Sequence, residues 1–299
     1  HCGSISLVTL GYRQDHREQV PPTAWLDRRS ASAFLPAVRQ AAHKTRYGGV
    51  MVLAGSPGLE GAAILTLLGA RCGGAGLLHL WSPGSARGDL NGLPAEVMFA
   101  PFTDHALASA KRCQAIVVGP GLGRSDQARE ALLQLLDAAP EAKWVLDADA
   151  LWHYAHEPFE LPARCLLTPH EGEAQRLVGQ DPLTGSWGGD RLQLLEAIVE
   201  RTQAAVLLKG AGNLLRGSGP TLVIPGSARA LARGGSGDLL AGLIAALAAR
   251  GLDLEAAAHV AIRLQLIAAQ RLSPGQAETA SQDLLADAFA QSWQELHAT

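Results

Sequence analysis

Asp238 stands at the junction between a glycine-rich turn and an apolar helix, in the stretch LARGGSGDLLAGLIAALAARG over residues 231–251. Leucine and isoleucine recur there at helical spacing, so a helix is predicted from residue 238 onward. The turn contains Gly234, Gly235 and Gly237. Its unpaired N–H groups would lie at the positive end of the helix dipole. N–H groups in such a position bind anions, most often phosphate. Asp238 could accept a proton from a ligand bound there, or Ser236 or Asp238 could simply cap the helix.

Five further polar or glycine-rich turns each follow a predicted strand. They are GSPGLEG (55–61), GPGLGRS (119–125), DADAL (147–151), TPHEGE (168–173) and KGAGN (209–213). Each has a structural interpretation: Asp147 could cap a helix, His170 by itself is more often structural, and residues 168–171 fit a capping box with proline at the first helical position. The carboxyl ends of parallel strands lie along one edge of a sheet, so all six turns should meet there. With Lys209 among them, the set suits a phosphate-bearing ligand.

The elements that must position these turns alternate between strands and helices. Predicted strands cover 49–55, 75–81, 115–119, 144–148, 165–170 and 205–210, and predicted helices cover 60–74, 126–138, 169–178 and 190–203. NLLRG and TLVIPG predict a hairpin. Several strands are continuous apolar runs, which is typical of strands buried on both faces. We therefore expect an α/β fold with a mostly parallel central sheet covered by helices on both faces. At the start of the chain, CGSISLVTLG predicts a short strand, and the polar, proline-containing residues up to 30 predict a linker.

Composition and charge exclude several classes of protein. The chain has 299 residues, of which 47% are hydrophobic, and a formal net charge of −3, which implies no attraction to nucleic acid or to a membrane surface. The longest apolar run, near residues 239–249, is too short to cross a bilayer, and no secretory signal is visible. The cysteines are Cys2, Cys72, Cys113 and Cys165. Without a CxxC pair they indicate free thiols of a cytoplasmic protein.

Two familiar nucleotide motifs fit poorly. Nothing in the chain matches the GxxxxGK[ST] phosphate loop. Strand 115–119, Gly119, Gly121 and Asp147 imitate a dinucleotide-binding βαβ unit, but the spacing is GxGxG. That interpretation also leaves GGSGD and LLKG unexplained, so it is a minor alternative.

The ordered set IVVGPGLG, VLDADAL, LLTPHEGEAQRL, VLLKGAGN and GGSGDLLAGLIAAL resembles the ADP/ATP-dependent NAD(P)H-hydrate dehydratases of the ribokinase-like superfamily. The resemblance runs from about His43 to the C-terminus and implies a three-layer sandwich. Related vitamin-precursor kinases share the glycine turn but have a TPN..E motif, where this chain has His170. Residues 1–12 resemble the tail of an NAD(P)H-hydrate epimerase. We therefore expect residues 1–30 to be such a tail plus linker and residues 31–299 to be the dehydratase domain of a bifunctional protein.

The resemblance also implies roles for individual residues. Asp238 would be the catalytic base, with its pKa lowered by the helix start so that it is ionised at neutral pH. The anion hole would comprise Gly234, Gly235, Ser236 and Gly237. The ADP or ATP co-substrate would contact Lys209, Gly210, Ala211, Gly212, Asn213 and Gly237. The NAD(P)H hydrate would contact Ala62, Gly121, His170 and Asp238. Glu173 and Asp147 would reach Mg²⁺ through water, with no direct protein ligand to the metal.

The chain departs from the family pattern in its nucleotide segment. Residues 227–232 read SARALA, with Ala228 where the family has asparagine, although Arg229 and Arg233 could still serve phosphates. Two other interpretations therefore stay open: a small-molecule kinase on the same fold, and a nucleotide-binding module that has lost catalysis. The partners implied are small-molecule nucleotides and further copies of the chain in a homo-oligomer, with no nucleic acid or membrane.

Overall fold

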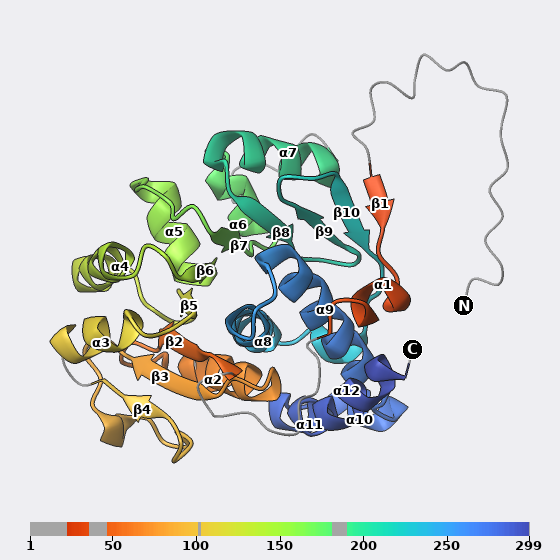
Figure 1. The fold of residues 1–299 in the computed structure, drawn as a ribbon, viewed down its shortest axis with the longest axis horizontal. Helices are drawn as coiled ribbons and strands as arrows, with labels where there is room; N and C mark the ends of the chain where they lie inside the picture. The colour runs from red at the N-terminus through yellow and green to blue at the C-terminus, as the bar shows by residue number, and fades with distance from the viewer. Residues whose placement is uncertain (1–22, 36–46, 101–102, 181–189, 299) are drawn as a thin grey trace, which may run out of the picture.

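The computed structural model describes residues 23–35, 47–100, 103–180 and 190–298. Their strands form one ten-stranded sheet in the order β1-β10-β9-β8-β7-β6-β5-β2-β3-β4 (Figure 1). The strands are β1 (Thr23–Trp25), β2 (Gly49–Leu53), β3 (Leu77–Trp81), β4 (Met98–Phe99), β5 (Ala115–Val118), β6 (Lys143–Leu146), β7 (Cys165–Leu167), β8 (Ala205–Leu208), β9 (Asn213–Arg216) and β10 (Thr221–Ile224). All neighbours pair in parallel except β9, which runs antiparallel to both β8 and β10. The predicted hairpin is thus confirmed.

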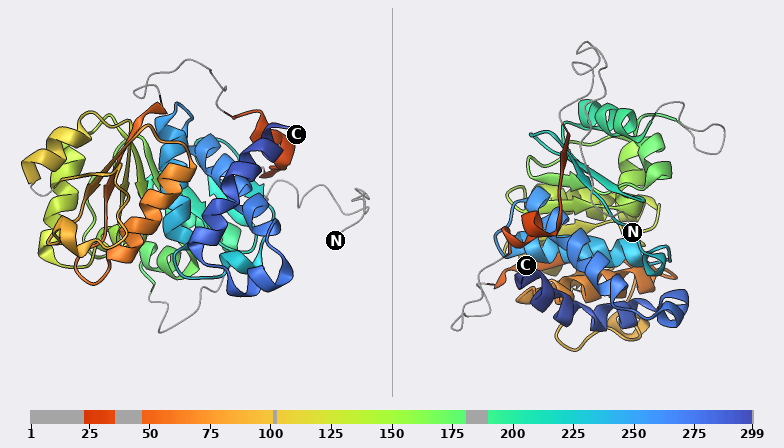
Figure 2. Two further views of the ribbon diagram at one scale, coloured as in Figure 1. Left: turned by 90° about the horizontal axis from the view of Figure 1, so that it is seen from below. Right: turned by 90° about the vertical axis from the view of Figure 1, so that its right-hand side faces the viewer.

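Helices cover both faces of this sheet, as Figures 1 and 2 show. One face carries α2 (Glu60–Cys72), α8 (Ser236–Ala249) and α9 (Leu254–Gln270), and the other carries α3 (Thr103–Ala110), α4 (Asp126–Ala138), α5 (Ala148–His156), α6 (Glu171–Leu177) and α7 (Arg191–Thr202). Beside α9 lie α1 (Arg28–Ser32), α11 (Gln282–Asp287) and α12 (Phe289–His297), and α10 (Pro274–Thr279) contacts the loop before α8. The predicted three-layer α/β sandwich is confirmed.

The apolar strand runs supply two separate cores because successive side chains of a strand point to opposite faces. In β2, Val50 and Val52 pack among α2, α8 and α9, whereas Met51 and Leu53 pack among the helices of the other face. All four side chains are fully buried. This explains why the strands show no polar alternation in the sequence.

Helix α8 is central to the molecule and packs against α2 at very short range. A Cβ added to Gly242 would lie 1.8 Å from the Thr66 carbonyl oxygen, and one added to Gly69 would lie 2.0 Å from that of Leu239. Only glycine allows this approach. Every residue from Leu239 to Ala249 is buried, as expected for a helix that is apolar on all sides. The contact holds the N-terminus of α8 against the ends of the central strands.

The structure corrects two predicted helix starts. The N-cap of α6 is His170, whose Nδ1 accepts the N–H groups of Gly172 and Glu173, so the capping box predicted to start at Thr168 is wrong. The Thr168 hydroxyl instead donates to the Leu146 carbonyl of the neighbouring strand. The N-cap of α8 is Gly235, with φ of 85°, and neither Ser236 nor Asp238 occupies that position.

Part of the N-terminal segment that was predicted to be a linker forms regular secondary structure. Thr23–Trp25 form β1 and Arg28–Ser32 form α1, and β1 adds to the sheet by pairing with β10. The strand predicted near residues 2–11 lies outside the described residues. Of the cysteines, Cys72, Cys113 and Cys165 are free thiols, while Cys2 lies in a range that is not described. Within the described ranges, the helices are too short or too polar to cross a membrane.

Candidate active site

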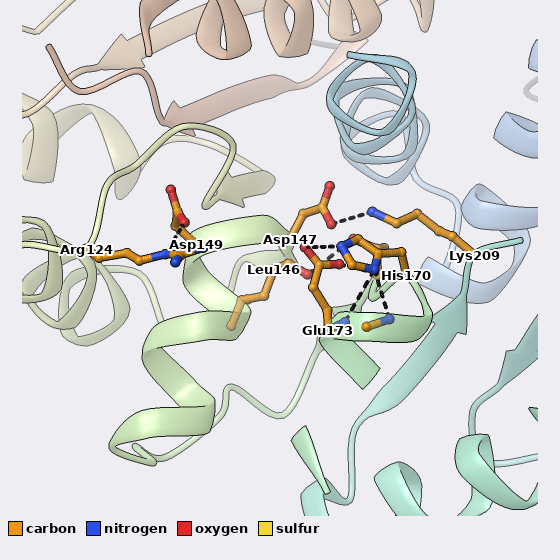
Figure 3. A network of polar contacts seen from close by, with 9 residues as sticks. Arg124, Leu146, Asp147, Asp149, His170, Glu173 and Lys209 are labelled. Carbon is orange, nitrogen blue, oxygen red and sulfur yellow. Dashed lines mark hydrogen bonds and ion pairs between the residues drawn. The ribbon is translucent and has the colours of Figure 1, made fainter. Parts of the chain in front are cut away.

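Four side chains from the carboxyl ends of β6, β7 and β8 converge at one edge of the sheet (Figure 3). Lys209 Nζ donates to Asp147 Oδ1 at 2.7 Å, and their side chains are 17% and 3% exposed. His170 and Glu173 lie beside this pair. Although burial lowers the pKa of Lys209, the carboxylates of Asp147, Glu173 and Asp238 outweigh it and raise that pKa. Lys209 is therefore a fixed cation among acidic groups. Sixty-two positions separate the two partners of the ion pair in sequence, so only the fold brings them together.

The Asp147 carboxylate is aimed at Lys209 rather than at its own helix. Asp147 is the N-cap residue of α5, but its side chain makes no capping hydrogen bond. Asp149 in the first turn of α5 instead accepts the Gly123 N–H at 2.9 Å and pairs with Arg124 Nε at 3.0 Å. These contacts fix the GPGLGRS turn on α5. Asp147 thus occupies the N-cap position that the sequence suggested, but its carboxylate does not cap the helix, because the buried cation of Lys209 captures it.

His170 is held in one protonation state by the backbone of α6. Its Nδ1 accepts N–H groups of Gly172 at 3.0 Å and Glu173 at 3.3 Å, so the ring proton sits on Nε2. Burial, followed by the charge of Lys209, lowers the pKa of His170 and keeps it neutral. Glu173 Oε2 accepts the His170 N–H at 2.8 Å, and its Oε1 lies 3.4 Å from Nε2. His170 is thus a helix cap whose Nε2–H lies beside the Glu173 carboxyl group.

Asp238 lies in the first turn of α8, next to the ion pair. A Cβ added to its neighbour Gly237 would be 3.4 Å from Lys209 Nζ and 3.9 Å from Asp147 Oδ2. Burial, followed by the charge of Asp147, raises the pKa of Asp238 to about 6, although Lys209 opposes the rise. The prediction that the helix start lowers this pKa is therefore wrong, because loss of solvation and the neighbouring carboxylate dominate. A carboxylate with a pKa near 6 is a stronger base than an ordinary aspartate.

A cavity of about 320 Å³ opens beside the glycine turn. The predicted residues that line it are Lys209, Gly210, Ala211, Asn213, Ser236 and Gly237. Ser227, Ala228, Leu231 and Ala232 of the SARALA segment also line it. The sequence does not indicate the remaining lining residues, which come from the end of the β9–β10 hairpin, from α8 and from α9: Gly226, Leu240, Ile262, Gln265 and Leu266. Apolar residues together with a few polar groups line it, as is usual for small-molecule sites. A larger cavity, of about 790 Å³, lies at the amino ends of β6–β8, away from the six turns.

The SARALA segment forms part of the cavity wall. Ser227 and Ala228 line the cavity, whereas Arg229 and Arg233 do not. Arg229 Nη1 pairs with Glu278 Oε1 of α10 at 2.6 Å, and Arg233 donates to the Glu278 carbonyl. The two arginines thus bind α10 in this structure, and the expectation that they serve phosphates has no support from it.

Ala62 and Gly121 are brought together on another side of the site. A Cβ added to Gly121, which has φ of 55°, would lie 2.9 Å from the Ala62 Cβ. The Ser56 N–H donates to the Gly121 carbonyl at 2.8 Å, which joins the first turn of the chain to the GPGLGRS turn. Neither residue lines the 320 Å³ cavity. This separation suits a site with two adjoining compartments.

Arg191 holds the KGAGN turn from behind, a role that no local pattern indicates. Its guanidinium donates to four carbonyls, those of Leu208 at 3.3 Å, Lys209 at 3.1 Å, Ala211 at 3.4 Å and Gly212 at 2.7 Å. The carbonyls of the turn are therefore directed to Arg191, which leaves the other side of the turn to the cavity.

The residues present suit a magnesium ion that arrives with a nucleotide. Within the described part of the chain, no group of three histidine, cysteine or acidic side chains could hold a metal ion. Asp147 already binds Lys209, and Glu173 binds His170. Mg²⁺ commonly keeps several waters and binds through substrate phosphates and one or two carboxylates, which matches this donor set.

Comparisons with known proteins agree with this fold and site. A ribokinase-like superfamily protein from Enterococcus faecalis superposes with a TM-score of 0.81 at 20% identity, covering 97% of this chain and 99% of that one. The chain thus has a ribokinase-like fold. The model of the NAD(P)H-hydrate dehydratase family matches residues 50–290, and the chain belongs to that family of lyases.

Individual relatives carry the same family name. The bifunctional NAD(P)H-hydrate repair enzyme of Coxiella burnetii is 32% identical over 280 residues, which are 91% of this chain and 55% of that protein. The ADP/ATP-dependent NAD(P)H-hydrate dehydratase from Bacillus subtilis, crystallised with ATP/Mg²⁺, is 27% identical with a TM-score of 0.77, covering 93% of this chain and 99% of that one. The chain spans about half the length of the curated relatives it matches.

Proposed function

We propose that this chain dehydrates hydrated NADH or NADPH to NADH or NADPH, with ADP or ATP as phosphoryl donor and Asp238 as the base. The observation that carries the assignment of the base is the position of Asp238. It lies in the first turn of α8, beside Lys209 and Asp147, and the same glycine turn borders the 320 Å³ cavity. A base, an anion site and a nucleotide-sized cavity therefore adjoin one another.

The mechanism follows from the charges at the turn. Asp238 accepts the proton of the ring hydroxyl while that oxygen bonds to the terminal phosphorus of the nucleotide and the bridging P–O bond breaks. The N–H groups of the turn and Lys209 stabilise the developing charge on the phosphoryl oxygens. The ring nitrogen then donates its lone pair, the carbon–oxygen bond breaks, and phosphate leaves. Loss of the neighbouring ring proton restores the reduced nicotinamide.

Several residues orient the two substrates in this scheme. Residues 209–213 hold the nucleotide, and His170, through its fixed Nε2 proton, donates to the hydrate. Ala62 and Gly121 lie against the nicotinamide ring. Mg²⁺, when bound with the nucleotide, supplies charge neutralisation of the phosphates, and Asp147 and Glu173 would reach it through water.

The decisive experiment is a turnover assay. The protein is mixed with hydrated NADH, Mg²⁺ and either ADP or ATP, and both the absorbance of NADH and free phosphate are followed. Recovery of NADH with equimolar phosphate supports the proposal and identifies the donor. A stable phosphorylated product would favour the small-molecule kinase instead. Nucleotide binding without turnover would favour the third interpretation, a nucleotide-binding module that has lost catalysis. That interpretation rests on the SARALA segment.

The pH dependence should report Asp238. Because its pKa is raised to about 6, the base is protonated below that pH, and kcat/KM for the hydrate should fall about tenfold per pH unit there. The measurement is the initial rate at saturating Mg-nucleotide between about pH 5 and 8. Burial raises the pKa of Glu173 to about 7, so Glu173→Gln separates the two groups. If the inflection near 6 disappears in Glu173→Gln, Asp238 is not its source.

Arg191 should matter for nucleotide binding more than for chemistry. Arg191→Met removes all four hydrogen bonds, three to the KGAGN turn and one to Leu208 at the end of β8, and the KM for the nucleotide should rise by about tenfold while kcat changes little. Arg201→Met, an exposed position at the end of the same helix, is the matched control. Equal KM values for the two variants would contradict the role of Arg191.

The proposed function also includes the location of the chain, its assembly and its connection to a second domain. The chain would act in the cytoplasm, as a homo-oligomer, and residues 1–30 would connect it to an epimerase domain. Light scattering on the purified chain tests the assembly, and epimerisation of the hydrate by the full-length protein tests the connection.

A further inference from the structure

One wall of the 320 Å³ cavity is a loop that its own backbone does not hold in place. Residues 226–228, directly after β10, line the cavity. Within the described ranges, residues 225–227 take part in one hydrogen bond, which Arg263 Nη1 of α9 donates to the Pro225 carbonyl at 2.9 Å. The position of this loop therefore depends on α9.

Helix α9 also supplies a neighbouring part of the same wall. Ile262, Gln265 and Leu266 line the cavity. A Cβ added to Gly226 would lie 2.8 Å from Leu266 Cδ1, so the loop and the helix are in direct contact. Arg263 follows Ile262 in sequence but is not among the lining residues. It contacts the wall from behind, and replacing it leaves every lining side chain in place.

The Arg263 guanidinium also binds the N-terminal arm, residues 23–32, which contains β1 and α1. Its Nη2 donates to the Leu26 carbonyl. The two Nη groups of an arginine are separate donors on a rigid plane, so one side chain can bind two carbonyls at a fixed separation. A single guanidinium thus joins the arm to the wall of the cavity.

Further contacts attach the arm itself to the sheet and to α9. The Leu26 N–H donates to the Val223 carbonyl of β10 at 2.9 Å. One turn before Arg263 on α9, His259 Nε2 donates to the Asp27 carbonyl at 3.3 Å. Ala31 of α1 is fully buried in the core that also contains α9. These contacts fix the Leu26 carbonyl, and with it the guanidinium.

We propose that Arg263 is a positioning residue for the nucleotide: by joining the Pro225 carbonyl to the N-terminal arm, it fixes the cavity wall and thereby sets the affinity for ADP or ATP. The inference rests on the nucleotide site of the proposed function, because it takes this cavity as that site. Residues 225–228 include none of those proposed for the chemistry, so the effect falls on nucleotide binding and leaves the transfer step unchanged.

The test is Arg263→Met, which keeps an unbranched side chain and removes the bridge. We expect the Kd of ATP and of ADP, measured by calorimetry, to rise by about tenfold, with kcat within about twofold of wild type. Arg271→Met, at the C-cap of the same helix and paired with Glu295, is the matched control and should leave the Kd unchanged. Arg263→Gln, too short for the bridge, should repeat the increase and serves if the methionine variant does not fold. A lower melting temperature with an unchanged Kd would show a purely structural role and overturn the proposal.

A double-mutant cycle tests the part played by the arm. Ala31→Glu places a charge in the buried contact between α1 and α9, which should loosen the arm and raise the Kd of ATP. Ala33→Glu, an exposed position directly after α1, is its control. Because the arm acts through Arg263, adding Ala31→Glu to Arg263→Met should raise the Kd no further. If the two effects add, or if Ala31→Glu alone leaves the Kd unchanged, the arm does not act through Arg263 and the proposal fails.

Binding and turnover together separate this inference from the proposed function. If wild type turns over hydrated NADH and Arg263→Met keeps its Kd and KM for the nucleotide, the inference fails and the proposed function stands. If wild type binds ATP without turnover and Arg263→Met binds it less tightly, the proposed function fails and the inference stands. If wild type binds neither nucleotide, both fail.

Discussion

Replacing Asp238 by asparagine should reduce the turnover of hydrated NADH by about 10²–10⁴-fold. Asparagine keeps the size of the side chain and the start of α8 but cannot accept the hydroxyl proton. Nucleotide affinity should be retained or increased, because the substitution removes a negative charge beside the phosphate site. The measurement is steady-state kinetics with ADP and with ATP, together with nucleotide binding by calorimetry. Asp137→Asn on the exposed side of α4 is the matched control.

The same variant should also change stability in a pH-dependent manner. The folded-state pKa of Asp238 is raised from 3.8 to about 6, so the folded protein binds a proton more tightly than the unfolded chain does. Stability from this group is therefore present at low pH and lost as the pH rises through about 6. Asp238→Asn should melt above wild type at pH 8, and the difference should shrink toward pH 4. If the variant is active, or if its melting temperature differs from that of wild type by the same amount at every pH, Asp238 does not have its proposed role.

Lys209→Met should have the largest effect on stability, about 3–5 kcal/mol at neutral pH. The substitution leaves the Asp147 carboxylate, 3% exposed, without its cation and close to the carboxyls of Asp238 and Glu173. Chemical denaturation of the variant measures the loss. Activity should fall as well, because the buried Lys209 Nζ lies beside Gly237 of the glycine turn.

A double variant separates the ion pair from the packing of the lysine stem. Lys209→Met with Asp147→Asn removes both charges, and it should recover much of the stability lost in the single variant while staying inactive. If the single variant is as stable as wild type, the pair does not hold the site together. If the double variant regains turnover, Lys209 does not stabilise the transferred group.

Much of the fold could be predicted because its signals are local. The apolar runs at 49–55 and 115–119 contain β2 and β5, and the helix predicted over 126–138 is α4. The main exceptions lie at the two ends of the chain. The sequence pattern gave no expectation for α9–α12 beyond residue 251, and it placed β1 in a linker. A three-residue edge strand such as β1 has no period to detect, and its existence depends on β10.

The composition of the site can be predicted from the sequence alone: a glycine turn before an apolar helix, an acid at its start, and the order of polar turns after strands. These features are local, because turn geometry and helical periodicity depend on neighbouring residues. The contact partners and the charge states of these side chains depend on the tertiary structure. The pairing of Lys209 with Asp147, the contacts of Arg191 and Arg263, and the raised pKa of Asp238 all arise between segments far apart in sequence. Burial and Coulomb interactions depend on distance in space, and the helix dipole that the sequence suggested for Asp238 is weaker than both.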